Sequence, residues 1–485
     1  MASRTPGVAY SITVRSAYPN EPGMLGKITS AIGEAGGSAQ AVDVVQTSKG
    51  EMVRDFTVNT SGHDHALNVV EAIKGVEKVT VRSVSDQTFL LHVGGKIEME
   101  SRVTVASRDD MSKAYTPGVG RVCMAIHEDP DAVWALTGKG HTVAVVSDGS
   151  AVLGLGDIGA AASLPVMEGK ALLFKEFGGV DAWPIVLDTK DTEEIIRTVK
   201  ALAPGFGGIN LEDIAAPRCF EIEERLRSEL DIPVFHDDQH GTAVVVLAGV
   251  INALKIVNKR PSDLRVVVAG VGAAGTACTN ILHTYGVKNI IGFDRSGALN
   301  KSRDYGENSM KQLFADSTNP ENFNGTLADG LIGADMLLGL AGPGLVTSDD
   351  VSNMTDDAIV FALSNPDPEI WPEEVPGNVR VMATGRTDYP NQVNNSLCFP
   401  GLFRGVLDVR ASTINDDMKI AAAEAIAGVI PDSHISEDFI IPSVFDKNVA
   451  KRVARSVARK AQATGVARRR RRRGDEVYAA FRTQS

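Results

Sequence analysis

The residues LRVVVAGVGAAGTA, from Leu264 to Ala277, predict the fold of the C-terminal half of the chain. It opens with a run of branched apolar residues, which is typical of a strand buried inside a parallel sheet. Gly270, Gly272 and Gly275 follow at once, in a G-x-G-x-x-G spacing that leads into a helix-like segment. Glycines at this place allow a tight turn and let a pyrophosphate reach the helix N-terminus. The stretch therefore predicts a dinucleotide-binding βαβ unit.

The residues around this turn indicate which dinucleotide binds. Ala273 and Ala274 complete the turn, where the first N–H groups of the helix favour a phosphate. The next predicted strand, 289–293, ends at Asp294, whose carboxylate suits a ribose 2′-hydroxyl and repels a 2′-phosphate. NAD is therefore the expected cofactor. NADP is the alternative, because the neighbouring Arg295 could partly offset that repulsion.

Strand-like and helix-like segments alternate on both sides of this unit. Downstream, the alternation predicts a Rossmann-type, doubly wound parallel sheet in a domain spanning 256–465. Upstream, it predicts a second α/β domain over 89–255. The strands are expected at 142–146, 182–187, 206–211, 232–235, 336–339, 359–363 and 379–382.

Four acidic residues stand where two of the upstream strands end: Glu212, Asp213, Asp237 and Asp238. Neighbouring side chains on a strand point to opposite faces, so adjacent acids converge only where the strand gives way to a turn. Ligands of open α/β sheets gather at the carboxyl ends of strands, and hard oxygen ligands suit Mg²⁺ or Mn²⁺. The four acids therefore predict a divalent-metal site, with solvated loop acids or helix caps as an equally weighted alternative.

Residues 1–88 are expected to form a separate small domain. Helix-like segments begin at Pro22-Gly23 and at about His63. The strand-like runs that alternate with them lie at 8–15, 39–47, 51–60 and 78–84. This order is βαββαβ, the arrangement of a ferredoxin-like fold, so the predicted fold class is α/β throughout.

Composition excludes several classes of protein. The net charge of −12 argues against nucleic-acid binding by the body of the protein. The four cysteines are scattered without metal-binding spacing, which fits a reducing compartment. No signal sequence or long apolar run is apparent, so the expected location is the cytoplasm, with no membrane anchor. The six arginines from Arg468 to Arg473 are expected in a solvated tail, 466–485, with a tail that binds a polyanion or nucleotide as the alternative.

Several motifs together resemble the malic enzyme family in its short bacterial form. They run in order from about 115 to 405, and FHDDQHGT at 235–242 is highly specific. The other matching stretches are YTPGV (115–119), SDGSAVLGLGDIG (147–159), PVMEGKALLFKEFGG (165–179), INLEDI (209–214), ALSNPDP (362–368) and NNSLCFPG (394–401). The first domain separately resembles an ACT domain, a regulatory module that often binds amino acids, through PGMLG at 22–26.

The resemblance implies a role for each residue that could carry chemistry. By residue type alone, Tyr115 and Lys170 are more often structural than catalytic. The family pattern makes Lys170 the general base, with a pKa depressed by burial near the metal, and makes Tyr115 the general acid. It makes Asp237 the acid that orients the base. The implied ligands of Mg²⁺ or Mn²⁺ are Glu212, Asp213 and Asp238.

The same resemblance implies how substrate is held, with one gap. Asn365 and Asn395 correspond to asparagines at the substrate, and Asn365 also to one at the nicotinamide side of the cofactor. Long, animal-type members hold the substrate carboxylate with an arginine where this chain has Ala151. The carboxylate anchor is therefore unassigned, and Arg108 and Arg121 are the remaining candidates.

The activity that the resemblance implies is oxidative decarboxylation of (S)-malate to pyruvate and CO₂ with reduction of NAD. The alternatives are a malic enzyme that prefers NADP, a hydroxyacid dehydrogenase that does not decarboxylate, and an inert metabolite sensor on a dehydrogenase scaffold. The expected partners are malate, a small-metabolite effector at the ACT-like domain, and further copies of the chain in a homodimer or larger homo-oligomer.

Overall fold

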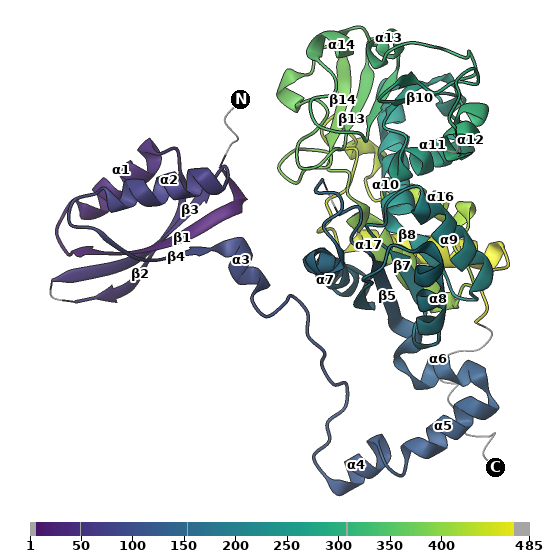
Figure 1. Cartoon of the computed structure of the whole chain (residues 1–485), viewed down its shortest axis with the longest axis horizontal. Coiled ribbons are helices and arrows are strands. Elements are labelled where there is room, and N and C mark those ends of the chain that lie inside the picture. Colours follow the sequence, from purple (N-terminus) through teal and green to yellow (C-terminus); the bar gives the residue numbers. More distant parts are fainter. Residues whose placement is uncertain (1–5, 49, 153, 307–308, 470–485) are drawn as a thin grey trace. The chain divides into compact units, whose positions relative to one another are not determined.

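The computed structural model describes residues 6–48, 50–152, 154–306 and 309–469 (Figure 1). The chain divides into two compact units, Met1–Met99 and Glu100–Ser485. Each unit buries apolar residues of its own.

The first unit contains an antiparallel four-stranded sheet in the order β2-β3-β1-β4. Helices α1 and α2 lie on one side of this sheet, and their apolar faces form the core with β1 and β3 (Figure 1). The elements are β1 (Gly7–Pro19), α1 (Met24–Glu34), β2 (Ser38–Thr47), β3 (Glu51–Thr60), α2 (His63–Lys74), β4 (Thr80–Asp86) and α3 (Gln87–His92). The predicted βαββαβ order is confirmed. The unit continues past residue 88, because the Thr88 hydroxyl of α3 donates to the Ala9 carbonyl of β1.

The first sheet of the second unit is parallel, in the order β6-β5-β7-β8. Every residue of β5 and β7 is buried, as expected for central strands with continuous apolar sequence. The strands are β5 (Thr142–Ser147), β6 (Asp181–Val186), β7 (Gly208–Leu211) and β8 (Val234–His236). All four lie within one or two residues of their predicted positions.

The second sheet of this unit has the order β11-β10-β9-β12-β13-β14. All its pairings are parallel except that of β11, which forms a short hairpin with β10 that the sequence did not predict. The strands are β9 (Arg265–Ala269), β10 (Asn289–Asp294), β11 (Gly297–Ala298), β12 (Met336–Gly339), β13 (Ala358–Ala362) and β14 (Val379–Thr384). The predicted Rossmann-type parallel sheet is confirmed.

Helices surround both sheets, and α10 lies in the core that the two sheets share. The helices of this unit are α4 (Arg108–Ala114), α5 (Val119–Glu128), α6 (Val133–Leu136), α7 (Ala160–Gly178), α8 (Thr192–Leu202), α9 (Arg218–Glu229), α10 (Asp237–Val257), α11 (Ala273–Tyr285), α12 (Ser309–Ser317), α13 (Leu327–Leu331), α14 (Ser348–Ser352), α15 (Phe399–Val409), α16 (Asp416–Ala427) and α17 (Asn448–Ala463). By length and composition, α10 is the one described helix that could cross a membrane. However, 67% of its most apolar 18-residue window is buried inside the fold, so α10 is a core helix.

Two further expectations change with the structure. Asp237 and Asp238 do not lie in a turn but are the first two residues of α10, where the helix dipole favours negative charge. Arg468 pairs with Asp231, and its backbone N–H donates to the Val409 carbonyl, so the start of the arginine run is attached to the second unit. The rest of that run, 470–473, lies outside the described residues.

Candidate active site

Two pairs of acids meet at the carboxyl edge of the first parallel sheet. Strands β7 and β8 pair through their last residues, so the acids that follow each strand are brought together. One carboxylate oxygen from each of Glu212, Asp213 and Asp238 lies within 4.8 Å of the others. The three predicted metal ligands therefore form one cluster.

The backbone of Asp213 explains how two adjacent acids can turn toward one place. Its φ is 54°, in the left-handed region that few residues other than glycine adopt and that Asp tolerates better than most. Its N–H donates to Asp238 Oδ2 at 2.8 Å, and its carbonyl accepts from the Ala151 N–H at 3.0 Å. The turn after β7 is thereby tied to the loop after β5 and to the start of α10.

The donor set fits a hard divalent cation. Glu212 and Asp213 are almost wholly buried, and burial is the main cause that raises the pKa of Glu212 to about 7 and that of Asp238 to about 6. Buried carboxylates this close together are unfavourable unless positive charge compensates them. Three carboxylate oxygens are ligands that Mg²⁺ and Mn²⁺ prefer, so Glu212, Asp213 and Asp238 are the residues that would hold such an ion.

Lys170 contacts this cluster through Glu212. It is 7% exposed on α7, and its Nζ is 2.7 Å from both Glu212 Oε1 and Asp237 Oδ2, with the Phe399 ring beneath it. The expected depression of its pKa beside a bound metal ion stays a prediction. Burial lowers the pKa of Lys170, but the charges of Asp237, Glu212 and Asp238 together raise it above its ordinary value. A divalent cation at the same carboxylates would oppose that rise.

Asn395 and Asn365 occupy different places at this site. Asn395 lies next to Asp237, the partner of Lys170, because a Cβ on Gly241 would lie 1.9 Å from Asp237 Oδ1 and 3.2 Å from Asn395 Cβ. Asn365 is exposed just after β13, and a Cβ on Gly154 would lie 2.4 Å from its carbonyl oxygen. Asn365 therefore belongs to the loop of the second sheet that touches the glycine-rich loop after β5.

The structure leaves Tyr115 away from these buried groups. Tyr115 follows α4 and is 65% exposed, and no contact between it and the carboxylate cluster is found among the described residues. Arg108 and Arg121, the candidate carboxylate anchors, are exposed on α4 and α5. None of these three side chains is brought into the cluster.

A different arginine lies beside Ala151. Arg218, at the start of α9, has its Nη2 2.5 Å from Asp148 Oδ2 and 2.9 Å from Ser150 Oγ. Both partners belong to the loop that follows β5 and precedes Ala151. The sequence did not indicate Arg218, because its contacts depend on the parallel pairing of β5 with β7.

The glycine-rich turn has the predicted geometry. Gly270 has a φ of 103°, and a Cβ there would lie 2.7 Å from the Leu340 carbonyl oxygen. A Cβ on Gly275 would lie 1.9 Å from the Gly270 carbonyl oxygen, whereas Gly272 faces open space. Two glycines are thus required by packing, and Gly272 leaves room for a ligand next to the start of α11, where Ala273 and Ala274 stand.

Asp294 is the end of β10, as predicted, but it is not alone. Arg303 donates to both of its carboxylate oxygens, at 2.9 and 2.8 Å, and Lys311 pairs with Oδ2. Burial works to raise the pKa of Asp294, but these two cations lower it to about 2. Arg295 is exposed to solvent. The cations that contact Asp294 are therefore Arg303 and Lys311, which sequence reasoning missed.

Glu223 is another functional candidate that sequence reasoning missed. It lies on the buried face of α9 with Cys219, Ile222 and Leu226, and an acid at an apolar helical position was a signal available in the sequence. Burial works to raise its pKa, but His240, His236 and Lys419 lower the pKa to about 2. Glu223 is therefore a buried carboxylate ion.

The second unit combines a Rossmann-type sheet and its glycine-rich turn with a buried carboxylate cluster that a lysine contacts. This combination is typical of a metal-dependent dinucleotide oxidoreductase. The chain matches two family models: the malic enzyme N-terminal domain over residues 94–227 and the malic enzyme NAD binding domain over residues 239–462. The chain belongs to the malic enzyme family.

Individual relatives agree with this assignment. The chain is 58% identical to an NAD-dependent malic enzyme of Geobacillus stearothermophilus, over 96% of this chain and 97% of that protein. It is 54% identical to a bifunctional malic/malolactic enzyme of Bacillus subtilis, over 80% and 95% of the two chains. The crystal structure of a malic enzyme from Pyrococcus horikoshii has a TM-score of 0.75 and 50% identity, covering 80% of this chain and 92% of that one.

Proposed function

We propose that the protein catalyses the oxidative decarboxylation of (S)-malate, so that malate and NAD⁺ give pyruvate, CO₂ and NADH. The observation that carries the proposal is the position of Lys170, held by two carboxylates beside the three-acid cluster. Oxidation of a hydroxyl by a dinucleotide is helped by a general base that removes the hydroxyl proton and by a metal ion that polarises the oxygen. Lys170 beside the three acids can serve as that base. The NADP-preferring enzyme and the inert sensor are disfavoured.

The oxidation at C2 assigns a separate role to each of these residues. Lys170 takes the proton of the C2 hydroxyl as hydride leaves C2 for the nicotinamide. Asp237, which lies beside Asn395, orients the lysine through its 2.7 Å contact. A divalent cation held by Glu212, Asp213 and Asp238 would supply the Lewis acidity that polarises the C2 oxygen.

The second half of the reaction breaks the bond between C3 and C4. The ketone formed at C2 lies β to the C4 carboxylate, so CO₂ can leave with its electron pair delocalised onto the C2 oxygen. Protonation at C3 then gives pyruvate. Tyr115 is proposed as the acid on its family motif alone, since its side chain is 65% exposed outside the buried cluster. Asn365 is proposed to contact the substrate and the nicotinamide side of the cofactor.

Initial-rate measurements test this function directly. Malate should support reduction of NAD with release of one CO₂ per NADH, and the rate should depend on added Mn²⁺ or Mg²⁺. Reduction of NAD without CO₂ would indicate a simple hydroxyacid dehydrogenase. Absence of turnover with either cofactor would indicate the sensor.

The first unit is proposed to be regulatory. It has its own core, and none of the proposed catalytic or metal-binding residues lies within its range. We propose that it is an ACT-like module that binds a small metabolite, that the protein works as a homodimer or larger homo-oligomer, and that it resides in the cytoplasm. Size-exclusion chromatography with light scattering tests the oligomer.

A further inference from the structure

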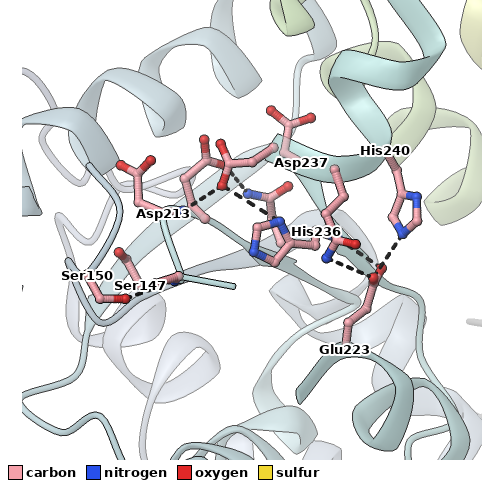
Figure 2. A network of polar contacts seen from close by, with 12 residues as sticks. Ser147, Ser150, Asp213, Glu223, His236, Asp237 and His240 are labelled. Atoms are coloured by element: carbon pink, nitrogen blue, oxygen red, sulfur yellow. Dashed lines mark hydrogen bonds and ion pairs between the residues drawn. The ribbon is translucent and has the colours of Figure 1, made fainter. Parts of the chain in front are cut away.

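Glu223 is a buried acid with three hydrogen-bond donors from one short segment. Glu223 is 5% exposed. It lies on α9, whereas the acids of the metal cluster follow strands β7 and β8. Glu223 Oε1 accepts from the His236 backbone N–H at 3.1 Å. Glu223 Oε2 accepts from Gln239 Nε2 at 3.4 Å. The same oxygen pairs with His240 Nε2 at 2.8 Å (Figure 2).

These donors lie on both sides of the two acids that open α10. His236 immediately precedes Asp237 and Asp238, and Gln239 and His240 immediately follow them. The Glu223 carboxylate therefore binds the chain on both sides of Asp237 and Asp238 and holds the junction between β8 and α10 in place. Glu223 holds the backbone that carries Asp238, which is one of the three clustered metal-ligand candidates.

His240 connects this contact to a second buried charge. Its Nδ1 is 3.2 Å from the Nζ of Lys419, a residue of α16 that is 6% exposed. A lysine ammonium can only donate, so His240 Nδ1 is the acceptor and its Nε2 carries the hydrogen that points to Glu223. The ring thus links the positive Lys419 to the negative Glu223 in a fixed orientation.

We propose that Glu223 is a positioning residue for the divalent cation: with His240 it holds the first turn of α10 so that Asp238 meets Glu212 and Asp213. The proposal rests on the proposed function, because it concerns the same metal site. Residues that orient the direct ligands of a metal typically contribute about 10–100-fold to metal affinity or activity. A group that merely braced the fold would change stability and leave metal affinity unchanged.

The test is direct binding of Mn²⁺ to the full-length protein, followed by the electron paramagnetic resonance signal of free Mn²⁺. Glu223→Gln keeps the size of the side chain but replaces an acceptor oxygen with a donor. Its Kd for Mn²⁺ should rise about 10–100-fold. The Mn²⁺ concentration for half-maximal activity should rise with it, while kcat at saturating Mn²⁺ recovers most of the wild-type value. NADH affinity, measured by fluorescence, should stay within about twofold.

The chain offers a matched control and a second pair of variants. Glu224→Gln removes the same charge from the exposed side of α9 and should bind Mn²⁺ like the wild type. His240→Gln keeps one donor and one acceptor in a planar group, whereas His240→Leu removes both. Weakened binding in His240→Leu, largely restored in His240→Gln, supports the proposal even if Glu223→Gln does not fold.

Two outcomes overturn different claims. If the wild type binds Mn²⁺ and the folded Glu223 and His240 variants bind it within about threefold, the positioning role is refuted and the proposed function stands. If the wild type binds no Mn²⁺ at millimolar concentration, the metal-dependent function itself fails, and the positioning role fails with it.

Discussion

Lys170 of α7 and Asp237 of α10 form a buried ion pair in which Nζ lies 2.7 Å from Oδ2. Lys170 is 7% exposed and Asp237 is fully buried. A buried ion pair usually adds little net stability, because desolvation of both charges offsets their attraction. A second contact of the lysine, to Glu212, makes the arrangement costlier to bury and places the lysine at the metal cluster. The pair is better explained by the chemistry it allows than by stability.

The first prediction tests this lysine as the base. Lys170→Ala should lower kcat for malate oxidation by at least ~10², because a positioned general base typically contributes 10²–10⁴ in rate. NADH binding should persist, since the dinucleotide turn lies on another sheet. Lys175→Ala is the control: Lys175 is on the same helix but is exposed and pairs with Asp181. A Lys170→Ala enzyme within about threefold of the wild type would refute the assignment.

The second prediction concerns the metal. Asp238→Asn removes one charged ligand, so the Mn²⁺ concentration needed for half-maximal activity should rise, and both malate oxidation and oxaloacetate decarboxylation should fall. Glu221→Gln, an exposed change on α9, should leave both activities unchanged. Full activity of EDTA-treated wild-type enzyme would show that the acids do not form a catalytic metal site.

Local patterns were sufficient to predict most of the fold. The apolar run of β9 was enough to predict a buried strand, and the three glycines after it were enough to predict the turn and the start of α11. The pattern placed the four acids at the carboxyl ends of strands, and the family resemblance implied Glu212, Asp213 and Asp238 as the ligands, which form one cluster. These predictions needed no knowledge of which distant residues touch.

What escaped prediction depends on contacts between distant segments. Glu223 gains its role only when α9 packs against the junction of β8 and α10. Arg303 and Lys311 reach Asp294 only after the chain turns back from β10. Tyr115 is the reverse case. Its motif identified it as a candidate, yet its side chain lies outside the buried cluster. A motif identifies a residue type and spacing, and tertiary packing decides its surroundings.

The third prediction uses the cations around Asp294. Asp294→Ser should shift kcat/KM toward NADP, because it removes the repelling carboxylate and releases Arg303 and Lys311 to pair with a 2′-phosphate. Adding Arg303→Ala should reverse much of the gain. Arg295→Ala, an exposed change beside them, should not. A wild-type enzyme that already prefers NADP would mean that these cations dominate over Asp294.

The fourth prediction follows from the pKa of Asp294, about 2 in the folded protein. An unfolded aspartate has a pKa of about 3.9, so the folded pKa is depressed and the carboxylate stabilises the fold above that value. This contribution, of order 1 kcal/mol for a partly solvated group, is lost as pH falls toward 2. The difference in Tm between wild type and Asp294→Ser should be constant from pH 5 to 8 and shrink below pH 4. A constant difference down to pH 3 would contradict the depressed pKa.

The last prediction separates regulation from chemistry. The first unit ends at Met99 and includes α3, so removal of residues 1–99 avoids cutting a helix that is bonded to β1. The truncated protein should keep kcat for malate within a few-fold, because all proposed metal, base and cofactor residues lie beyond residue 99.

Any response to small metabolites should disappear with that unit. An effector acts only as far as its affinity differs between two conformations, so a ligand of the first unit should change KM for malate in the full-length protein alone. Amino acids and central carboxylates are the compounds to screen against both proteins, with light scattering to record the oligomer of each. A metabolite that shifts KM equally in both acts on the second unit. No response in either, together with a smaller oligomer after truncation, would make the first unit an assembly element and refute its regulatory role.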